Sequence, residues 1–225
     1  MTSPRVNNVS GPEQPTYVVV EGPIGVGKTS LARRLAASFG YETLLEDPGA
    51  NPFLERFYND PGRHALATQL YFLFQRVRQL EPLRQGDLFH PPRVADFIVE
   101  KDMLFAEVTL DPDEMHLYEQ VYARLSLSVP APDLVIYLQA SADILLDRIR
   151  RRGVAFEQTI DREYLEKLCD AYARFFFSYS GAPLLMVNAA HINLVDGDQD
   201  YDALLEYLAG IKTGRHFLNP LSGSG

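Results

Sequence analysis

The sequence predicts an α/β domain with a parallel, five-stranded sheet covered by helices on both faces, on three observations. Five short runs rich in Val, Ile and Leu alternate along the chain with longer runs of helical periodicity. One of the apolar runs, residues 133–138, is nearly continuous, as in the central strand of a parallel sheet. The 225 residues, of which 46% are hydrophobic, suffice for one large core. Ligands of such sheets bind at the carboxyl ends of the strands.

The first predicted strand, residues 17–20, leads directly into a glycine-rich loop with the sequence GPIGVGKT at residues 22–29. Residues 29–39 follow with leucines at helical spacing. Strand, glycine loop, Lys-Thr and helix together form the phosphate-binding P-loop signature. Its glycines let backbone N–H groups converge on phosphate oxygens, and the helix points its positive end at the same anion. Lys28 adds a charge for the β- and γ-phosphates, and Thr29 offers a hydroxyl to Mg²⁺.

We prefer this interpretation to an ordinary glycine turn, because both flanking elements are of the expected type. The fold expected is therefore the three-layer P-loop NTPase type. The predicted nucleotide-binding residues of the loop are Gly22, Pro23, Ile24, Gly25, Val26, Gly27, Lys28, Thr29 and Ser30.

The composition of the chain excludes several classes of partner other than a nucleotide. The chain carries 21 basic and 30 acidic side chains, a net charge of −9, which argues against a nucleic-acid polymer as partner. No apolar run reaches membrane-spanning length, and the N-terminus lacks a signal-peptide core. The single cysteine, Cys169, excludes an intramolecular disulfide and is expected to be a small core residue. We therefore expect a cytoplasmic protein that does not bind membranes.

The remaining elements place the domain at residues 17–212, between flexible tails at 1–16 and 213–225. The later strands are predicted at 41–45, 94–99, 133–138 and 183–187. The later helices are predicted to open at Asn51 and to cover 63–83, 103–110, 114–126, 141–152, 159–178 and 201–210.

An arginine cluster at the end of one predicted helix comprises Arg148, Arg150, Arg151 and Arg152. Phosphoryl transfer is catalysed mainly by positioning and by stabilising spread negative charge, and a mobile basic segment can close on the phosphates. The alternative is a solvated basic face at a helix C-terminus, where the helix dipole favours cations. Beside a P-loop we favour the lid.

Two carboxylates could orient or deprotonate an attacking hydroxyl. Asp96 lies near the carboxyl end of a predicted strand, and Glu46 follows the second strand and competes for the role. The alternative is that these acids cap turns or helices. Spacing alone does not single out the other polar candidates, which are Tyr58, Gln69, Arg76, Asp102 and Glu157.

Six motifs in order resemble the deoxynucleoside kinase family, which includes deoxycytidine, deoxyguanosine and bacterial deoxyadenosine kinases. The resemblance runs from about residue 17 to residue 208. The motifs are the P-loop, Glu46 five residues before Asn51-Pro52, residues 57–61, residues 68–76, Asp96 six residues before Asp102, and residues 148–152 followed by Glu157 and 164–168.

The resemblance implies phosphorylation of a deoxyribonucleoside by ATP and Mg²⁺ in nucleotide salvage, and a homodimer. It implies that Glu46, or Asp96 beside it, handles the 5′-hydroxyl, with Glu46 the usual base. On the substrate side, the resemblance implies that Tyr58 and Glu157 hold the 3′-hydroxyl, that Gln69 pairs with the edge of the base, and that Arg76 and Asp102 form a charged pair over the base. On the nucleotide side, it implies that Lys28, Arg148 and Arg152 bind phosphate and that Thr29 and Asp96 hold the metal. Thymidine-type members have small or apolar residues at the charged pair, so a base with an amino group is expected: deoxyadenosine, deoxyguanosine or deoxycytidine.

The chain departs from the family pattern directly after Asp96. Relatives have an arginine and a serine there, whereas this chain has Phe97-Ile98, so one transition-state cation is missing. Lys101 or Arg93 could replace it. Val154 also stands where relatives often have another lid arginine. The missing arginine leaves open a nucleotide-binding member of the family with weak or no catalysis. A nucleoside monophosphate kinase is a separate alternative.

Overall fold

Six parallel strands form one sheet in the order β2-β3-β1-β4-β5-β6. The computed structural model of the chain describes residues 15–84, 91–125, 130–190, 192–194 and 197–219. The strands are β1 (Tyr17–Glu21), β2 (Glu42–Leu44), β3 (Arg93–Ala95), β4 (Leu134–Gln139), β5 (Leu184–Asn188) and β6 (Arg215–Leu218). The central strands β1 and β4 are the most apolar, and Val18, Val19, Val20, Val135 and Ile136 are fully buried. The predicted parallel sheet is therefore confirmed.

The prediction of five strands and of a C-terminal tail from residue 213 is wrong, because β6 adds a sixth strand at the sheet edge. Arg215 anchors it by donating to the carbonyls of Phe177 and Tyr179, each at 2.6 Å. The strand is four residues long, partly exposed and mixed in polarity, so its sequence lacks the apolar run that marked the other strands. Residues 1–14 of the predicted N-terminal tail lie outside the described residues.

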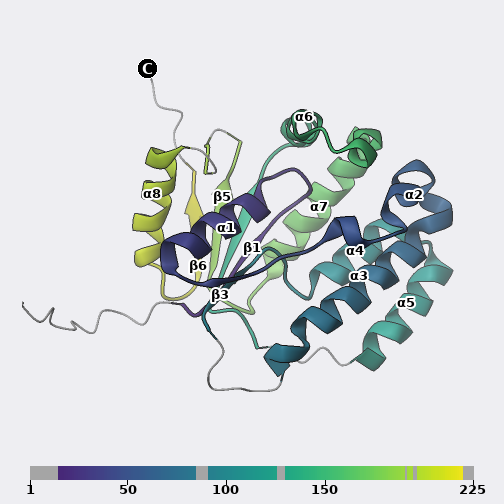
Figure 1. The fold of residues 1–225 in the computed structure, drawn as a ribbon, viewed down its shortest axis with the longest axis horizontal. Helices are drawn as coiled ribbons and strands as arrows, with labels where there is room; N and C mark the ends of the chain where they lie inside the picture. Colours follow the sequence, from purple (N-terminus) through teal and green to yellow (C-terminus); the bar gives the residue numbers. More distant parts are fainter. Residues whose placement is uncertain (1–14, 85–90, 126–129, 191, 195–196, 220–225) are drawn as a thin grey trace, which may run out of the picture.

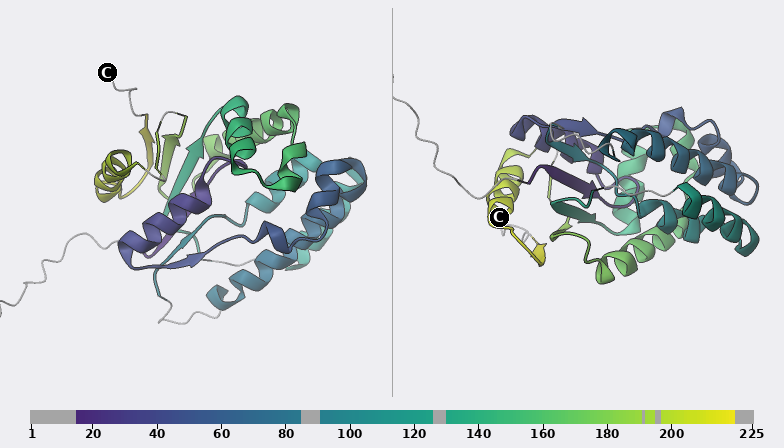
Figure 2. Two further views of the ribbon diagram at one scale, coloured as in Figure 1. Left: turned by 45° about the horizontal axis from the view of Figure 1, so that its top comes forward. Right: turned by 90° about the horizontal axis from the view of Figure 1, so that it is seen from below.

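Helices cover both faces of the sheet (Figures 1 and 2). On one face lie α1 (Lys28–Phe39) and α8 (Asp198–Ala209), where the Arg34 guanidinium stacks 3.9 Å from the centre of the Tyr201 ring. On the other lie α4 (Lys101–Thr109) and α7 (Arg162–Ser178), where the Tyr172 ring packs on Phe105 and on Tyr137 of β4. Together these contacts give the three-layer arrangement that the sequence predicts.

Three further helices, α2 (Leu54–Asn59), α3 (Pro61–Arg84) and α5 (Pro112–Leu125), form a helical region beside the sheet (Figure 1). The helix α6 (Ala142–Arg152) and the short 3₁₀ turns η1 (Pro48–Ala50) and η2 (Ala155–Thr159) complete the chain's helices among the described residues. None of the helices in this part of the chain is both long and apolar enough to cross a lipid bilayer.

Several predicted boundaries move by a few residues for local reasons. The helix predicted to open at Asn51 begins at Leu54, since the Asn51 side chain accepts from the Phe53 N–H at 3.0 Å. The helix predicted from residue 159 begins at Arg162, because Asp161 caps it by accepting from the Tyr164 N–H. The strand predicted over 94–99 ends at Ala95, so Asp96 lies just beyond its carboxyl end.

The turn into the P-loop depends on a glycine at position 22. Gly22 has φ = 152°, and a Cβ there would lie 2.6 Å from the carbonyl oxygen of Leu138. We expect Gly22→Ala to lower the free energy of unfolding by about 1–3 kcal/mol, as measured by urea denaturation. The matched control is Gly62→Ala, where the added methyl meets no atom within 4 Å. Equal stability of the two variants would contradict this account.

Candidate active site

A cavity of about 110 Å³ lies beside the P-loop. Its walls come from the P-loop, the segment after β2, the end of β3, helices α2, α3, α4 and α7, and the turn after α6. The predicted site residues that line it are Lys28, Thr29, Glu46, Tyr58, Gln69, Arg76, Asp96, Arg152 and Glu157. Residues as far apart in the sequence as Lys28 and Glu157 therefore meet in one cavity, as the family resemblance requires.

The P-loop has the backbone conformation of a phosphate cradle. Gly22, Gly25 and Gly27 have positive φ angles of 152°, 84° and 103°, and α1 begins directly after them at Lys28. Burial lowers the pKa of Lys28, and the nearby Lys101 ammonium lowers it further. Convergent N–H groups, a helix N-terminus and a lysine suit a triphosphate, so the residues present fit this ligand.

Asp96 ties the P-loop to the segment after β2. Its Oδ2 accepts from the Thr29 hydroxyl at 2.5 Å, and its Oδ1 accepts from the Glu46 N–H at 2.8 Å. A hydroxyl and a carboxylate in contact are two hard oxygen donors, the kind that Mg²⁺ prefers. With one oxygen used to hold the Glu46 backbone, Asp96 is better placed for a metal than for removing a proton.

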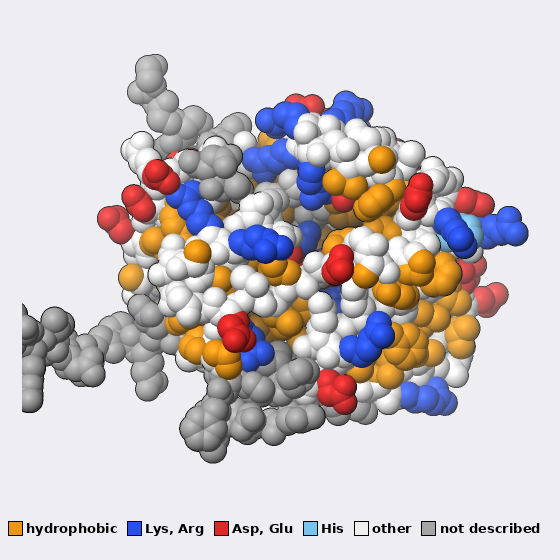
Figure 3. Space-filling model, in the orientation of Figure 1, with side chains coloured by type: hydrophobic (Ala, Val, Ile, Leu, Met, Phe, Trp, Pro, Cys, Tyr) orange, Lys and Arg blue, Asp and Glu red, His pale blue; other side chains and the backbone are white. Residues whose placement is uncertain are grey.

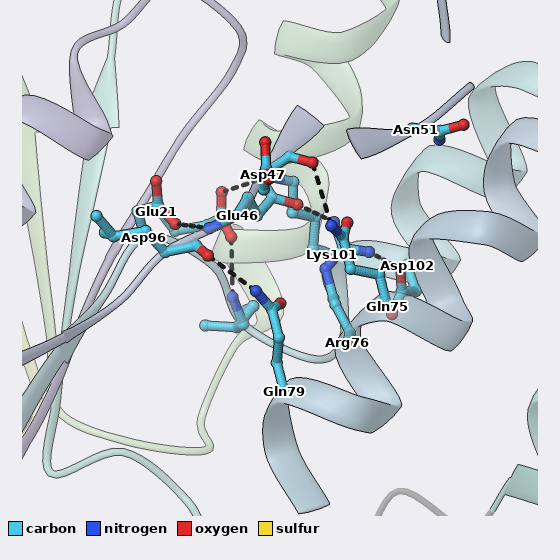
Figure 4. Close-up of polar contacts among 12 residues, drawn as sticks. Glu21, Glu46, Asp47, Asn51, Gln75, Arg76, Gln79, Asp96, Lys101 and Asp102 are labelled. Atoms are coloured by element: carbon cyan, nitrogen blue, oxygen red, sulfur yellow. Dashed lines mark hydrogen bonds and ion pairs between the residues drawn. The ribbon is translucent and has the colours of Figure 1, made fainter. Parts of the chain in front are cut away.

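Glu46 lies between two cations (Figure 4). Its Oε1 pairs with Arg76, and its Oε2 accepts from the Lys101 Nζ at 2.5 Å. Burial alone would raise the pKa of this carboxyl, but Lys101, Arg76 and Lys28 together hold it well below its usual range. Glu46 is therefore ionised at neutral pH and can accept a proton.

Arg76 pairs with both Glu46 and Asp102. The Asp102 side chain is fully buried and does not line the cavity, so it can act on a ligand only by holding Arg76. Among the described residues its carboxylate has no partner besides Arg76. Gln69, also on α3, is 3% exposed and lines the same cavity.

Tyr58 and Glu157 approach the cavity from α2 and η2. The Tyr58 ring stacks on Phe156 and meets the edge of Tyr164. Burial, together with Tyr164 and Glu157, raises the pKa of Tyr58 well above its usual value, so its hydroxyl remains a donor. Glu157 pairs with Arg152 of α6. A hydroxyl donor and a carboxylate acceptor therefore lie at one end of the cavity, as a sugar hydroxyl would need.

The arginines of α6 lie in different environments. Figure 3 shows basic side chains gathered over this helix. Arg152 lines the cavity, with 47% of its side chain exposed. Arg148 instead donates to the carbonyls of Val26 at 3.2 Å and Ala189 at 2.6 Å, which ties α6 to the P-loop. Arg148 also lines a groove of about 880 Å³ on the other side of the loop, together with Arg151 and Arg152.

Glu21, the last residue of β1, is a buried polar residue that the sequence analysis missed. It is fully buried and accepts from the Gly22 N–H at 2.8 Å, the Ile98 N–H at 3.0 Å and the Tyr172 hydroxyl at 2.9 Å. The sequence signal that could have identified Glu21 is an acidic residue at the end of an apolar strand, directly before the glycine loop.

The two candidates for the missing arginine lie in different places. Lys101 contacts Glu46 inside the cavity. Arg93 lies at the start of β3, away from the carboxyl ends of the strands, and donates to the Pro91 carbonyl at 3.3 Å. Phe97 is fully buried in a separate apolar cluster with Leu80. Lys101 is therefore the candidate that the structure brings to the site.

The model of the deoxynucleoside kinase family matches residues 18–211. The chain belongs to the deoxynucleoside kinase family. Deoxyguanosine kinase of Bacillus subtilis (strain 168) is 37% identical over 161 residues, which cover 69% of this chain and 76% of the relative. Deoxyadenosine kinase of Lactobacillus acidophilus is 30% identical over 192 residues, 79% of this chain and 87% of the relative.

A solved structure shows the same similarity. Deoxyadenosine kinase from M. mycoides, with the products dCMP and dCDP bound, aligns with a TM-score of 0.74 and 25% identity. The alignment covers 85% of this chain and 98% of that one. The predicted family and P-loop fold are therefore confirmed, and the protein is a phosphotransferase.

Proposed function

We propose that this deoxynucleoside kinase transfers the γ-phosphoryl group of ATP to the 5′-hydroxyl of a deoxyribonucleoside whose base has an amino group. One observation carries the proposal: a single cavity is lined by the P-loop lysine Lys28, the ionised Glu46 and the base-side Arg76. Phosphate, reacting hydroxyl and base would thus each meet a group of suitable chemistry.

In the proposed reaction Glu46 accepts the proton of the 5′-hydroxyl. The 5′-oxygen forms a bond to the γ-phosphorus while the bond from that phosphorus to the β,γ-bridging oxygen breaks, and ADP leaves. Lys28 and Arg152 line the cavity and would stabilise the negative charge that spreads over the transferred group. Mg²⁺, held by the Thr29 hydroxyl and the Asp96 carboxylate, would neutralise charge on the β- and γ-phosphates.

The base preference is argued from the buried charges. Arg76 offers donors to ring nitrogens and carbonyl oxygens of a base, and Gln69 offers both a donor and an acceptor. The relatives compared above are named deoxyguanosine and deoxyadenosine kinases, which supports a purine deoxynucleoside as the first substrate to test. Deoxycytidine remains the third choice.

The two alternatives are less well supported. A monophosphate acceptor carries charge and needs arginines around it, whereas the residues expected at the acceptor are neutral or acidic: Tyr58, Gln69 and Glu157. A binding protein without catalysis was suggested by the missing arginine after Asp96. Lys101 supplies a cation at the reacting carboxylate, which weakens that argument.

The protein is also proposed to act as a cytoplasmic homodimer in nucleotide salvage. Helices α3 and α5 expose Phe74 (46%) and Leu117 (48%), and hydrophobic side chains gather on this side of the molecule in Figure 3. Such a surface suits a second copy of the chain.

The test is ATP turnover by the purified protein in Mg²⁺ with each of the four deoxynucleosides and their 5′-monophosphates. We expect 5′-phosphorylation of deoxyguanosine, deoxyadenosine or deoxycytidine, with Lys28→Ala lowering kcat by roughly 10²-fold or more. The matched control is Lys167→Ala, a lysine with 60% of its side chain exposed on α7. Turnover with monophosphates alone, or ATP binding without turnover, would reject the proposal.

A further inference from the structure

Five buried side chains of alternating charge run from the end of β1 to the base side of the cavity. In order they are Glu21, Lys101, Glu46, Arg76 and Asp102, and none has more than 10% of its side chain exposed (Figure 4). A buried charge costs several kcal/mol unless it is paired, and apolar residues in its place are often as stable or more so. Stability alone therefore gives little reason for an ammonium group at position 101.

Lys101 has a position that a purely structural role does not require. Its Nζ lies 2.5 Å from the Glu46 Oε2 and 3.9 Å from the Glu21 Oε1, and its side chain lines the cavity. The Glu21 carboxylate is itself fixed by the Ile98 N–H and the Tyr172 hydroxyl. The ammonium is thus held from two sides, directly beside the carboxylate that would receive the 5′-hydroxyl proton.

Lys101 also lies near the P-loop lysine. Both side chains line the cavity, and the charge of Lys101 contributes to lowering the pKa of Lys28. Two like charges held close together in a buried site repel each other, and an anion between them would relieve this repulsion. The transferred phosphoryl group is such an anion, because negative charge spreads over its equatorial oxygens.

On the basis of the proposed function, we propose that Lys101 is the catalytic cation beside the accepting 5′-hydroxyl. It takes the place of the family arginine, whose sequence position is occupied by Phe97 in this chain. Phe97 is fully buried against Leu80, and its ring brings no charge to the reacting groups. Lys101, at the start of α4, reaches Glu46 instead. It orients Glu46 for the proton and contacts the phosphoryl group as the 5′-oxygen attacks and ADP leaves.

The first test is Lys101→Ala, assayed with the deoxynucleoside that the wild type phosphorylates best. We expect kcat to fall by about 10²–10³-fold, while the affinity for ATP changes little. Added methylammonium should restore part of the lost kcat, because a small amine can occupy the space that the side chain leaves. Tetramethylammonium, which cannot donate a hydrogen bond, should not. Lys167→Ala is the matched control and should respond to neither.

The second test is Lys101→Met, which keeps an unbranched apolar side chain and serves if the alanine variant does not fold. Its kcat should fall by about 10²–10³-fold, as for the alanine variant, while its affinity for ATP and its free energy of unfolding change little.

The outcomes separate this inference from the proposed function. A wild type that phosphorylates no deoxynucleoside overturns both. An active wild type with a Lys101→Met variant whose kcat stays within about threefold overturns the role of Lys101 alone. A loss of kcat with no amine rescue, or a loss that comes with an equal loss of ATP affinity and stability, would mean that Lys101 only supports the fold, which also overturns the inference.

Discussion

Replacing Glu46 by glutamine should lower kcat for deoxynucleoside phosphorylation by about 10²–10⁴-fold, the usual contribution of a general base. The amide cannot take up the proton of the 5′-hydroxyl, although it has nearly the shape of the carboxylate. Both cations beside Glu46 keep a second carboxylate nearby, since Lys101 has Glu21 and Arg76 has Asp102. The variant is therefore expected to fold and to bind ATP. Steady-state kinetics and ATP titration would measure the two properties separately.

The control for this prediction is Glu42→Gln, an exposed carboxylate at the start of β2, which should leave kcat unchanged. A parallel Asp96→Asn variant distinguishes the two acids. If Asp96 binds the metal, the decrease in kcat of Asp96→Asn should be smaller at high Mg²⁺ concentration. The decrease in kcat of Glu46→Gln should not depend on the Mg²⁺ concentration. Full activity of Glu46→Gln would exclude Glu46 as the base.

Local signals in the sequence were enough to predict the P-loop and its supporting elements. The loop needs glycines at fixed positions between an apolar strand and a helix, and these requirements are visible in adjacent residues. The central strands were also predictable, because a strand buried on both faces has a continuous apolar sequence. The edge strand β6 was missed because it is short, partly exposed and paired on one side only.

The partners of the charged site residues could not be predicted from spacing. Arg148 and Arg152 belong to the same helix, but one bonds to backbone carbonyls and the other pairs with Glu157. Glu21 ends an apolar strand, and nothing in its neighbours indicates that Ile98 and Tyr172 bond to it. Such pairings depend on how distant elements pack, whereas the residue types that a P-loop kinase needs can be read from the chain itself.

We expect Asp102→Ala to lower the free energy of unfolding by about 1–3 kcal/mol, since the buried Arg76 guanidinium keeps Glu46 but loses its other carboxylate partner. Arg76→Met combined with Asp102→Ala removes both charges and should be more stable than Asp102→Ala alone. Urea denaturation of Asp102→Ala, Arg76→Met and the double variant gives the coupling energy between the two side chains. Asp170→Ala, at an exposed position on α7, is the matched control.

The same variants test how the base is chosen. Because Asp102 does not line the cavity, its removal should act through Arg76, so both single variants should lose activity on the same amino-bearing bases. The double variant has an uncharged, more open base side, like that of thymidine-type relatives, and its preference should move towards thymidine. An Asp102→Ala variant that keeps wild-type stability but changes its preference would mean that Asp102 contacts the base directly. In that case Arg76 and Asp102 would have to separate when the substrate binds.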